Sequence, residues 1–401
     1  MYILRKYQQE AVDASYKFLT ESKRKGGLIV APTGSGKSLI IGTLAKLLKE
    51  NTNHKTLVIQ SSKEILIQNY EKFTSYGYTA GIYSASIGRK DLDDVVFSTI
   101  GSVKDKYYQL KDYHFVIIDE CHTVNSDKGM YENFFEMSRR IGSEKKILGL
   151  TASPFRLSTK SWGSVLKLLT RTRPRILDTL VYSINSEILV DEGFIHPINY
   201  YSLPVVYRKQ LSVNSSGSEY DDKSLMSAYA EIGHNDQIVA IADRLLNNVK
   251  KPELSRKNLL IFVRFIEDAE YIASKIGAVV ISSETPKKLR DEYVLGFKQG
   301  NIKCVVNCLV LGTGFDFPQL ETVLFARSTM SLNIWYQCVG RLSRVHKDKE
   351  DAWLIDCGDN LGLFGKIEDL RFVPKENGTH YMSGLVNGIR KQLTNVLLSK
   401  D

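Results

Sequence analysis

Short runs of apolar, mostly β-branched residues alternate along the chain with longer stretches in which apolar residues recur at helical spacing. The short runs predict strands at 26–31, 56–61, 94–99, 115–120 and 146–152, and again at 258–263, 278–283, 302–310, 322–327 and 352–357. The stretches between them predict amphipathic helices, for example at 38–50, 63–77, 265–277 and 286–300. Strands that read as continuous apolar runs are typical of parallel sheets covered by helices. The pattern therefore predicts an α/β fold with two parallel-sheet units.

The alternation breaks between the two groups of strands. Residues 212–222 read SVNSSGSEYDD, a polar and serine-rich stretch that is typical of a linker or mobile loop. We therefore predict a first domain at 1–185, an irregular linker at 186–232, a second domain at 233–360 and a C-terminal extension of mixed, partly helical structure at 361–401.

Charge adds a possible partner to this picture. The 401 residues carry a formal net charge of +9, which fits a polyanion such as nucleic acid. One cluster, KLLTRTRPR at 167–175, has four basic residues and no acidic one; it fits a solvated face and a phosphate-contacting patch equally well.

Other classes are disfavoured by the same sequence. No apolar run approaches the roughly 18 residues that predict a membrane span. The first charge, Arg5, comes too early for a signal peptide, so a cytoplasmic protein is expected, in the host cytoplasm if a phage encodes it. The five cysteines are scattered without a C-x-x-C pair, which argues against a disulfide framework and against structural zinc.

The segment APTGSGKS (31–38) joins a predicted strand to a predicted helix. Glycines let such a loop curl so that its N–H groups face a phosphate, and the following helix adds its positive end. The lysine can reach the β and γ phosphates, and the last serine can bind Mg²⁺. The strict pattern has glycine at the first position, where this chain has Ala31. The predicted ATP contacts are Thr33, Gly34, Ser35, Gly36, Lys37 and Ser38.

The segment IIDECHTV (117–124) supplies the acidic partner that a phosphate loop needs. Asp119 is predicted to hold Mg²⁺, and Glu120 to orient or deprotonate the attacking water. A metal cluster of the four polar side chains, a nucleophile pair of Cys121 with His122, and a polar strand end without chemistry are the alternatives. The nucleophile pair ranks far lower, because neighbouring strand residues point to opposite faces. Cys121 is expected to be a small spacer that packs under the site.

Four segments in this order, APTGSGKS, DECH, LGLTASPFR (148–156) and QCVGRLSR (337–344), resemble the motifs of superfamily 2 helicases and translocases. The similarity covers roughly residues 3–357. It is greatest to the DECH-box group of RadD-like and restriction-type helicases, and looser to phage branch-migration helicases of the UvsW type. The resemblance implies two RecA-like lobes in tandem with a short C-terminal extension, ATP and Mg²⁺ as cofactors, and nucleic acid as partner.

The resemblance also implies roles for further residues. LRKYQQEA (4–11) is similar to the family's adenine-recognition segment, with Arg5 and Gln8 as contacts. In LGTGFDFP (311–318), Thr313 would touch the nucleic-acid backbone, and Gly314 and Asp316 the nucleotide. His122 would lie at the seam between the lobes and couple hydrolysis to nucleic-acid grip. Other positions implied in nucleic-acid contact or coupling are Lys63, Gln68, Ser98, Thr99, Thr151, Ser153 and Arg156.

Gln337, Arg341 and Arg344 are spaced i, i+4 and i+7, which predicts one shared helix face. A solvated basic face is the plain interpretation. Against it, Gly340 inside a helix costs stability and calls for a functional reason. The resemblance makes Arg341 and Arg344 arginine fingers, a role worth roughly 10³–10⁵ in rate.

These observations together predict an ATP-dependent DNA helicase that unwinds or branch-migrates forked or junction DNA in replication, recombination or repair. The protein is expected to be a monomer when free. The alternatives are the motor subunit of a restriction system, an annealing or remodelling protein whose nucleic-acid binding is switched by ATP, and an RNA helicase.

Overall fold

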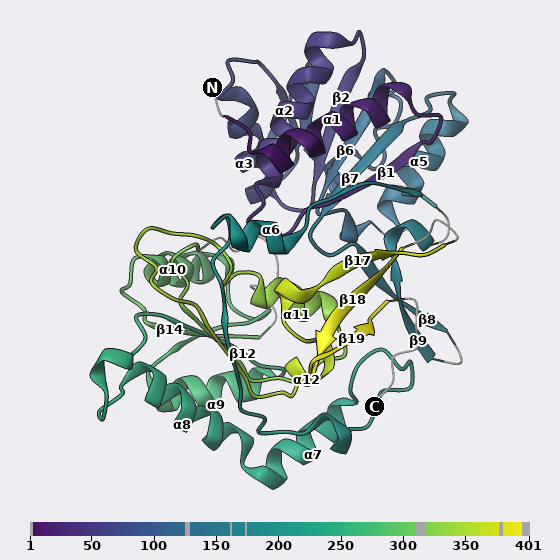
Figure 1. The fold of residues 1–401 in the computed structure, drawn as a ribbon. Helices are drawn as coiled ribbons and strands as arrows, with labels where there is room; N and C mark the ends of the chain where they lie inside the picture. The colour runs from purple at the N-terminus through teal and green to yellow at the C-terminus, as the bar shows by residue number, and fades with distance from the viewer. Residues whose placement is uncertain are drawn as a thin grey trace. The chain divides into compact units, whose positions relative to one another are not determined.

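A computed structural model describes residues 3–124, 129–160, 163–172, 175–308, 317–376 and 380–394 (Figure 1). The chain divides into two compact units. The first comprises residues 1–156 and 167–185, and the second comprises residues 157–166 and 186–401.

The first unit is built on an eight-stranded sheet with the order β10-β1-β7-β6-β2-β5-β3-β4. Its strand pairs are parallel except for β3 with β4. The central strands β1 and β7 are buried at every position, as is typical of a parallel sheet that helices cover on both faces. The strands are β1 (Gly26–Val30), β2 (Lys55–Gln60), β3 (Gly81–Ser84), β4 (Arg89–Lys90), β5 (Val95–Thr99), β6 (Tyr113–Asp119), β7 (Lys146–Thr151) and β10 (Thr179–Ser183).

The helices of this unit are amphipathic, and α2 contacts both α1 and α3. The buried positions of α2 include Ile40, Leu44 and Leu48, which recur every four residues and so lie on one face. The helices are α1 (Lys6–Glu21), α2 (Lys37–Asn51), α3 (Lys63–Thr74), α4 (Ile100–Val103) and α5 (Met130–Arg140), with short 3₁₀ turns η1 (Cys121–Thr123) and η2 (Leu169–Arg171). A separate two-stranded sheet is formed by β8 (Phe155–Lys160) and β9 (Gly163–Leu168).

The second unit has a six-stranded parallel sheet with the order β11-β16-β15-β12-β14-β13. Two helices, α8 and α9, lie side by side along it, and their apolar residues share a buried cluster with β12 (Figure 1). The strands are β11 (Asn199–Ser202), β12 (Leu259–Phe262), β13 (Val279–Ile281), β14 (Cys304–Asn307), β15 (Thr322–Phe325) and β16 (Trp353–Asp356). The helices are α6 (Ser186–Asp191), α7 (Asp222–Ile232), α8 (His234–Leu246), α9 (Ile266–Ile276), α10 (Lys287–Lys298), α11 (Leu332–Val339) and α12 (Leu361–Phe364), with 3₁₀ turns η3 (Arg208–Gln210), η4 (Pro252–Leu254) and η6 (Ile367–Asp369).

The segment predicted to be an irregular linker, 186–232, is instead a folded part of the second unit. It contributes α6, α7 and the edge strand β11, which pairs with β16. Within its serine-rich stretch, the side chain of Asn214 accepts a hydrogen bond from the main-chain N–H of Ser218 at 3.0 Å. Glu219 accepts hydrogen bonds from the hydroxyl of Thr329 at 2.6 Å and from the N–H of Met330 at 2.8 Å. Short polar side chains therefore order this stretch by bonding the main chain locally.

The C-terminal extension differs from the expected mixture as well. It contains a three-stranded antiparallel sheet of β17 (Arg371–Pro374), β18 (His380–Val386) and β19 (Ile389–Gln392). Asn387 and Gly388, with φ of 51° and 76°, make the tight turn between the last two strands, and this dipeptide is the commonest signal for such a hairpin.

Among the described residues, no helix combines the length and the apolar character that a membrane span requires.

Candidate nucleotide-binding site

The loop between β1 and α2 has the backbone geometry of an anion site. Gly34 and Gly36 have φ of 87° and 80°, in the left-handed region that other residues avoid. Gly36 is the N-cap of α2, which runs for 15 residues, and the first turn of that helix carries no acidic residue. The free N–H groups and positive end of such a helix favour a phosphate. Lys37 and Ser38 occupy the first two positions of α2, and Thr33 lies half-buried in the loop.

Side chains at the start of α1 form hydrogen bonds with the main chain of this loop. The side-chain amide of Gln8 donates to the carbonyl of Ser35 at 2.9 Å, and the hydroxyl of Tyr7 donates to the same carbonyl at 3.1 Å. The side-chain oxygen of Gln8 accepts a hydrogen bond from the N–H of Arg5 at 3.0 Å. The structure thus brings the predicted residues Arg5 and Gln8 to the phosphate loop. Sequence reasoning missed Tyr7, although a tyrosine next to these positions on a buried helix face was a usable signal.

Replacing Gly36 by alanine is expected to destabilise the loop by about 1–2 kcal/mol, because the residue is left-handed. In addition, the new Cβ would lie 2.5 Å from the side-chain nitrogen of Gln8. Nucleotide binding should weaken in a titration with ATP, and the unfolding temperature should fall. Gly101→Ala is the matched control, since Gly101 lies in α4 with open space around it. Equal nucleotide affinity in the two variants would contradict this description of the loop.

Two carboxylates follow the end of β6, which lies between β2 and β7. Asp119 is 3% exposed and accepts hydrogen bonds from the side chain of Asn69 and from the N–H of Glu120, each at 2.9 Å. Burial and the adjacent charge of Glu120 raise the pKa of Asp119. A nearby cation would stabilise the ionised form of this buried carboxylate.

Glu120 has φ of 50°, a left-handed conformation that is uncommon for a residue other than glycine. The strand ends here, and the Glu120 carboxylate lies 3.3 Å from the ammonium of Lys37 and 3.3 Å from Nδ1 of His122. Burial alone would raise the pKa of Glu120, but the charge of Lys37 and the hydrogen bond with His122 outweigh burial and lower it. Glu120 is therefore held as a carboxylate, the form that accepts a proton or orients a water.

His122 connects this carboxylate to the end of β7. Its Nδ1 lies 3.0 Å from the hydroxyl of Thr151, and that hydroxyl lies 3.4 Å from the carboxylate of Glu120. The same hydroxyl accepts a hydrogen bond from the N–H of Ser153 at 3.1 Å. The DECH segment and the TAS segment are thus joined through side chains. Arg156 donates to the carbonyl of Val124 at 3.1 Å, beyond this network.

Cys121 does not share the chemistry of its neighbours. It is fully buried, and a Cβ added to Gly149 would lie 2.7 Å from its sulfur, so the thiol packs against the main chain of β7. Burial and the charge of Glu120 raise its pKa, which keeps the thiol protonated. Among the described residues, no group of three or more His, Cys, Asp or Glu could hold a metal ion. The four polar side chains of DECH are therefore not one cluster.

Sequence reasoning missed Asn69, which is fully buried and bonds Asp119. Its signal was a polar residue in the buried stripe of α3, between Leu66 and Phe73. The predicted positions on this helix lie elsewhere: Gln68 is exposed, and Lys63 is 3.8 Å from Glu64.

Ser98 was predicted to contact nucleic acid, and the structure contradicts this. Its side chain is fully buried inside β5, between β2 and β3, and donates to the carbonyl of Val58 at 3.3 Å. A side chain in the middle of a covered strand cannot reach a bound strand of nucleic acid. Thr99 ends the same strand half-buried, with its hydroxyl 2.9 Å from that of Ser102.

In the second unit, the prediction that Gln337, Arg341 and Arg344 share one helix face is wrong. Helix α11 ends at Val339, and the two arginines lie in the turn that follows. Gly340 is the C-cap of the helix, with φ of −59° and ψ of −13°, and is not inside it. Arg341 is 6% exposed, whereas Arg344 is half-buried. The predicted contacts Thr313, Gly314 and Asp316 lie outside the described residues.

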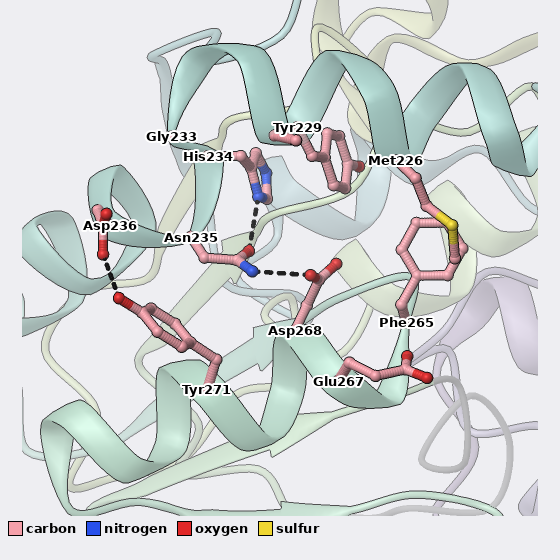
Figure 2. A pocket seen from close by; sticks show the side chains of 11 residues that line it. Met226, Tyr229, Gly233, His234, Asn235, Asp236, Phe265, Glu267, Asp268 and Tyr271 are labelled. Carbon is pink, nitrogen blue, oxygen red and sulfur yellow. Dashed lines mark hydrogen bonds between the residues drawn. The ribbon is translucent and has the colours of Figure 1, made fainter.

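The second unit also carries a cavity of about 490 Å³ beside α7, α8 and α9 (Figure 2). Tyr229 stacks on His234 with ring centres 3.9 Å apart. Its acidic residues, Asp236, Glu267 and Asp268, stand in the first turns of α8 and α9. Negative charge there is stabilised by the helix dipoles, so the acidity of this cavity has a structural cause.

Two family models match the chain. The model described as "Type III restriction enzyme, res subunit" matches residues 1–156, and "Helicase conserved C-terminal domain" matches residues 240–346. A "51.5 kDa protein" of a Lactococcus phage is 26% identical over 337 residues, which are 82% of this chain and 65% of that protein. The "DNA 3'-5' translocase XPB2" of Sulfurisphaera tokodaii is 24% identical over 387 residues, with 88% and 81% covered.

Among solved structures, the Type ISP restriction-modification enzyme LlaBIII bound to DNA superposes with a TM-score of 0.65 at 18% identity, over 89% of this chain and 28% of that chain. This likeness confirms the predicted fold class, two RecA-like parallel-sheet lobes in tandem. The chain spans 51% to 65% of the length of several curated relatives.

Proposed function

This chain belongs to the superfamily 2 helicases and translocases, an ATP-hydrolysing family, and on that premise we propose that it is an ATP-driven motor that acts on DNA. The most specific form of the proposal is a helicase that unwinds or branch-migrates forked or junction DNA in replication, recombination or repair. One observation carries the assignment of an ATP-driven motor. A contiguous polar network runs from the phosphate loop to the end of β7 through the side chains of Lys37, Glu120, His122 and Thr151.

The residues around the loop fit ATP with Mg²⁺. The carboxylate of Asp119 and the hydroxyl of Ser38 are oxygen ligands of the type that Mg²⁺ prefers, and the bound ion would neutralise phosphate charge. Lys37 stabilises the negative charge of the phosphates, and Glu120 takes the proton of the attacking water. Arg5 and Gln8 bind the adenine from α1.

The second unit completes this proposal. Arg341 and Arg344 act as fingers on the developing charge, and Gln337, Gly314 and Asp316 belong to the nucleotide side. Lys63, Gln68, Thr99 and Thr313 grip the nucleic-acid backbone. In this proposal the ATP-binding lobe is the predicted 1–185 without the segment 157–166, and the second lobe is the predicted 233–360 together with 186–232 and 361–401. If ATP favours one arrangement of two nucleic-acid-binding surfaces over another, its binding and hydrolysis can drive directed movement along the nucleic acid.

His122→Ala is expected to separate turnover from movement. Glu120 keeps Lys37 as a partner, so ATP hydrolysis should survive in part, whereas the link to Thr151 is reduced to the 3.4 Å contact of its hydroxyl with the Glu120 carboxylate. The number of base pairs separated per ATP hydrolysed should fall severalfold. Thr151→Val removes the other end of the same link and should act alike. Equal loss of hydrolysis and strand separation in both variants, or no loss of either, would contradict the coupling role.

The net charge of +9 fits either nucleic acid, and DNA is favoured by two similar proteins, one named a DNA translocase and one solved on DNA. The test is the ATPase rate measured with single-stranded DNA, forked DNA and RNA of the same sequence. We expect the largest stimulation with forked DNA, and a steep fall with added salt because the contacts are to phosphates. Stimulation by RNA alone would overturn the DNA assignment.

A second candidate, the motor of a restriction system, is favoured by the family model over residues 1–156 and by the similarity to LlaBIII. That function needs a nuclease besides this motor. Displacement of a third strand from an intact duplex, without separation of the strands of a fork, would favour it over the helicase.

A further inference from the structure

The turn that carries Arg341 and Arg344 is fixed by hydrogen bonds from within it and from outside it. The N–H of His196 donates to the carbonyl of Ser343 at 2.6 Å. The hydroxyl of Ser343 donates to the carbonyl of Gly340 at 2.8 Å. Carbonyls beyond a helix end have no partner in the helix and must find one elsewhere. Two further carbonyls of this turn, those of Leu342 and Arg344, are satisfied by a single side chain.

That side chain is Lys349. Its ammonium donates to the carbonyl of Leu342 and, at 3.2 Å, to the carbonyl of Arg344. Lys349 is 6% exposed, and burial lowers its pKa to about 8. No carboxylate of the described residues lies within salt-bridge distance of it. A buried ammonium is costly, and an apolar side chain would fill the same space at lower cost, so what lysine adds here is the pair of hydrogen bonds.

We propose that Lys349 is a positioning residue for the arginine turn: it ties the carbonyls on both sides of Ser343 together and so fixes the direction of Arg341 and Arg344. The inference rests on the proposed function of these arginines. A finger acts only where its guanidinium meets the developing charge, and a displacement of about 1 Å can cost a hundredfold in rate. The turn lies outside any helix, and the two bonds of Lys349 add to its main-chain hydrogen bond from the N–H of Leu342 to the carbonyl of Val339 at 2.9 Å.

The chain contains a close match to Lys349 that serves as the control. Lys145, in the first unit, is 4% exposed and donates to the carbonyls of Leu110 at 2.7 Å and Lys111 at 3.1 Å. Burial lowers its pKa to about 8 as well. It ties a turn that carries none of the residues placed in the nucleotide site. Any general effect of losing a buried ammonium should appear in both lysines.

The experiment compares Lys349→Met with Lys145→Met in the full chain, by thermal unfolding and by DNA-stimulated ATP turnover. Both variants should lose similar stability. Only Lys349→Met should lower kcat, roughly 10- to 100-fold, with KM for ATP within about twofold of the parent. Lys349→Arg, which keeps the donors, should recover part of the rate and gives a second readout if the methionine variant does not fold. Equal effects of the two methionine variants on kcat would overturn the proposal.

A combined variant separates this inference from the function on which it rests. If Lys349 acts through the fingers, Lys349→Met should have no further effect on kcat once both Arg341 and Arg344 are alanine. An undiminished effect in that background would overturn the positioning role and leave the ATPase assignment intact. Unchanged turnover in Arg341→Ala by itself would instead contradict the proposed function.

Discussion

Glu120→Gln is expected to reduce ATP turnover by about 10²–10⁴-fold, the usual contribution of a positioned general base. The amide keeps the shape of the side chain but accepts no proton. It also removes the negative charge 3.3 Å from Lys37, which leaves the ammonium free to bind phosphate. ATP binding should therefore stay the same or tighten while turnover is lost.

The measurement is single-turnover hydrolysis together with an ATP binding titration. Glu144→Gln is the control, because Glu144 is exposed in the same unit and pairs with Lys25 at 2.7 Å. It should bind and hydrolyse ATP like the parent. Turnover retained by Glu120→Gln would remove Glu120 from the site, whereas loss of both turnover and ATP binding would point to local unfolding.

Arg341→Ala should lower kcat by about 10³–10⁵-fold, the range found for arginine fingers, with a much smaller change in ATP affinity. The planar guanidinium offers two parallel donors to phosphoryl oxygens, which an ammonium cannot copy. Arg341→Lys should therefore remain strongly impaired although its charge is kept.

Truncation of Arg341 also affects packing, because its side chain is only 6% exposed. Thermal unfolding of each variant reports that effect. Arg244→Ala, at an exposed position of α8, is the control and should leave kcat unchanged. A rise in the KM for ATP without a fall in kcat would mean that Arg341 binds ground-state nucleotide and is no finger.

Much of the fold could be predicted from the sequence because its central strands are buried on both faces and therefore read as apolar runs. Some of the strands that were missed lack this property: β10 is only half-buried along its length, and both residues of β4 are exposed. The four-residue β3 was missed as well, although all of its positions are buried. The hairpin at Asn387 and Gly388 carried a clear turn signal, but its flanking strands, such as the mostly exposed β19, did not look apolar.

The residues of the candidate site likewise fall into those with a local sequence signal and those that only the fold brings together. Local signals located the strand-to-helix loop before α2 and the carboxylates at the end of β6, since glycine spacing and a strand end are local features. Asn69 bonds Asp119 from a helix 50 residues earlier, a contact that only the folded sheet creates. The end of α11 at Val339 was missed because helical spacing continues to Arg344 in the sequence, whereas the helix ends with Gly340 as its C-cap.

The most direct measurement records ATP hydrolysis and strand separation together on forked DNA, for the parent chain and for Lys37→Ala. The parent should hydrolyse ATP much faster with DNA than without it and should separate the strands only when ATP is present. Lys37→Ala should do neither, while its unfolding temperature stays close to that of the parent. Hydrolysis that persists in Lys37→Ala, or parent turnover that is indifferent to nucleic acid, would contradict an ATP-driven motor at this site.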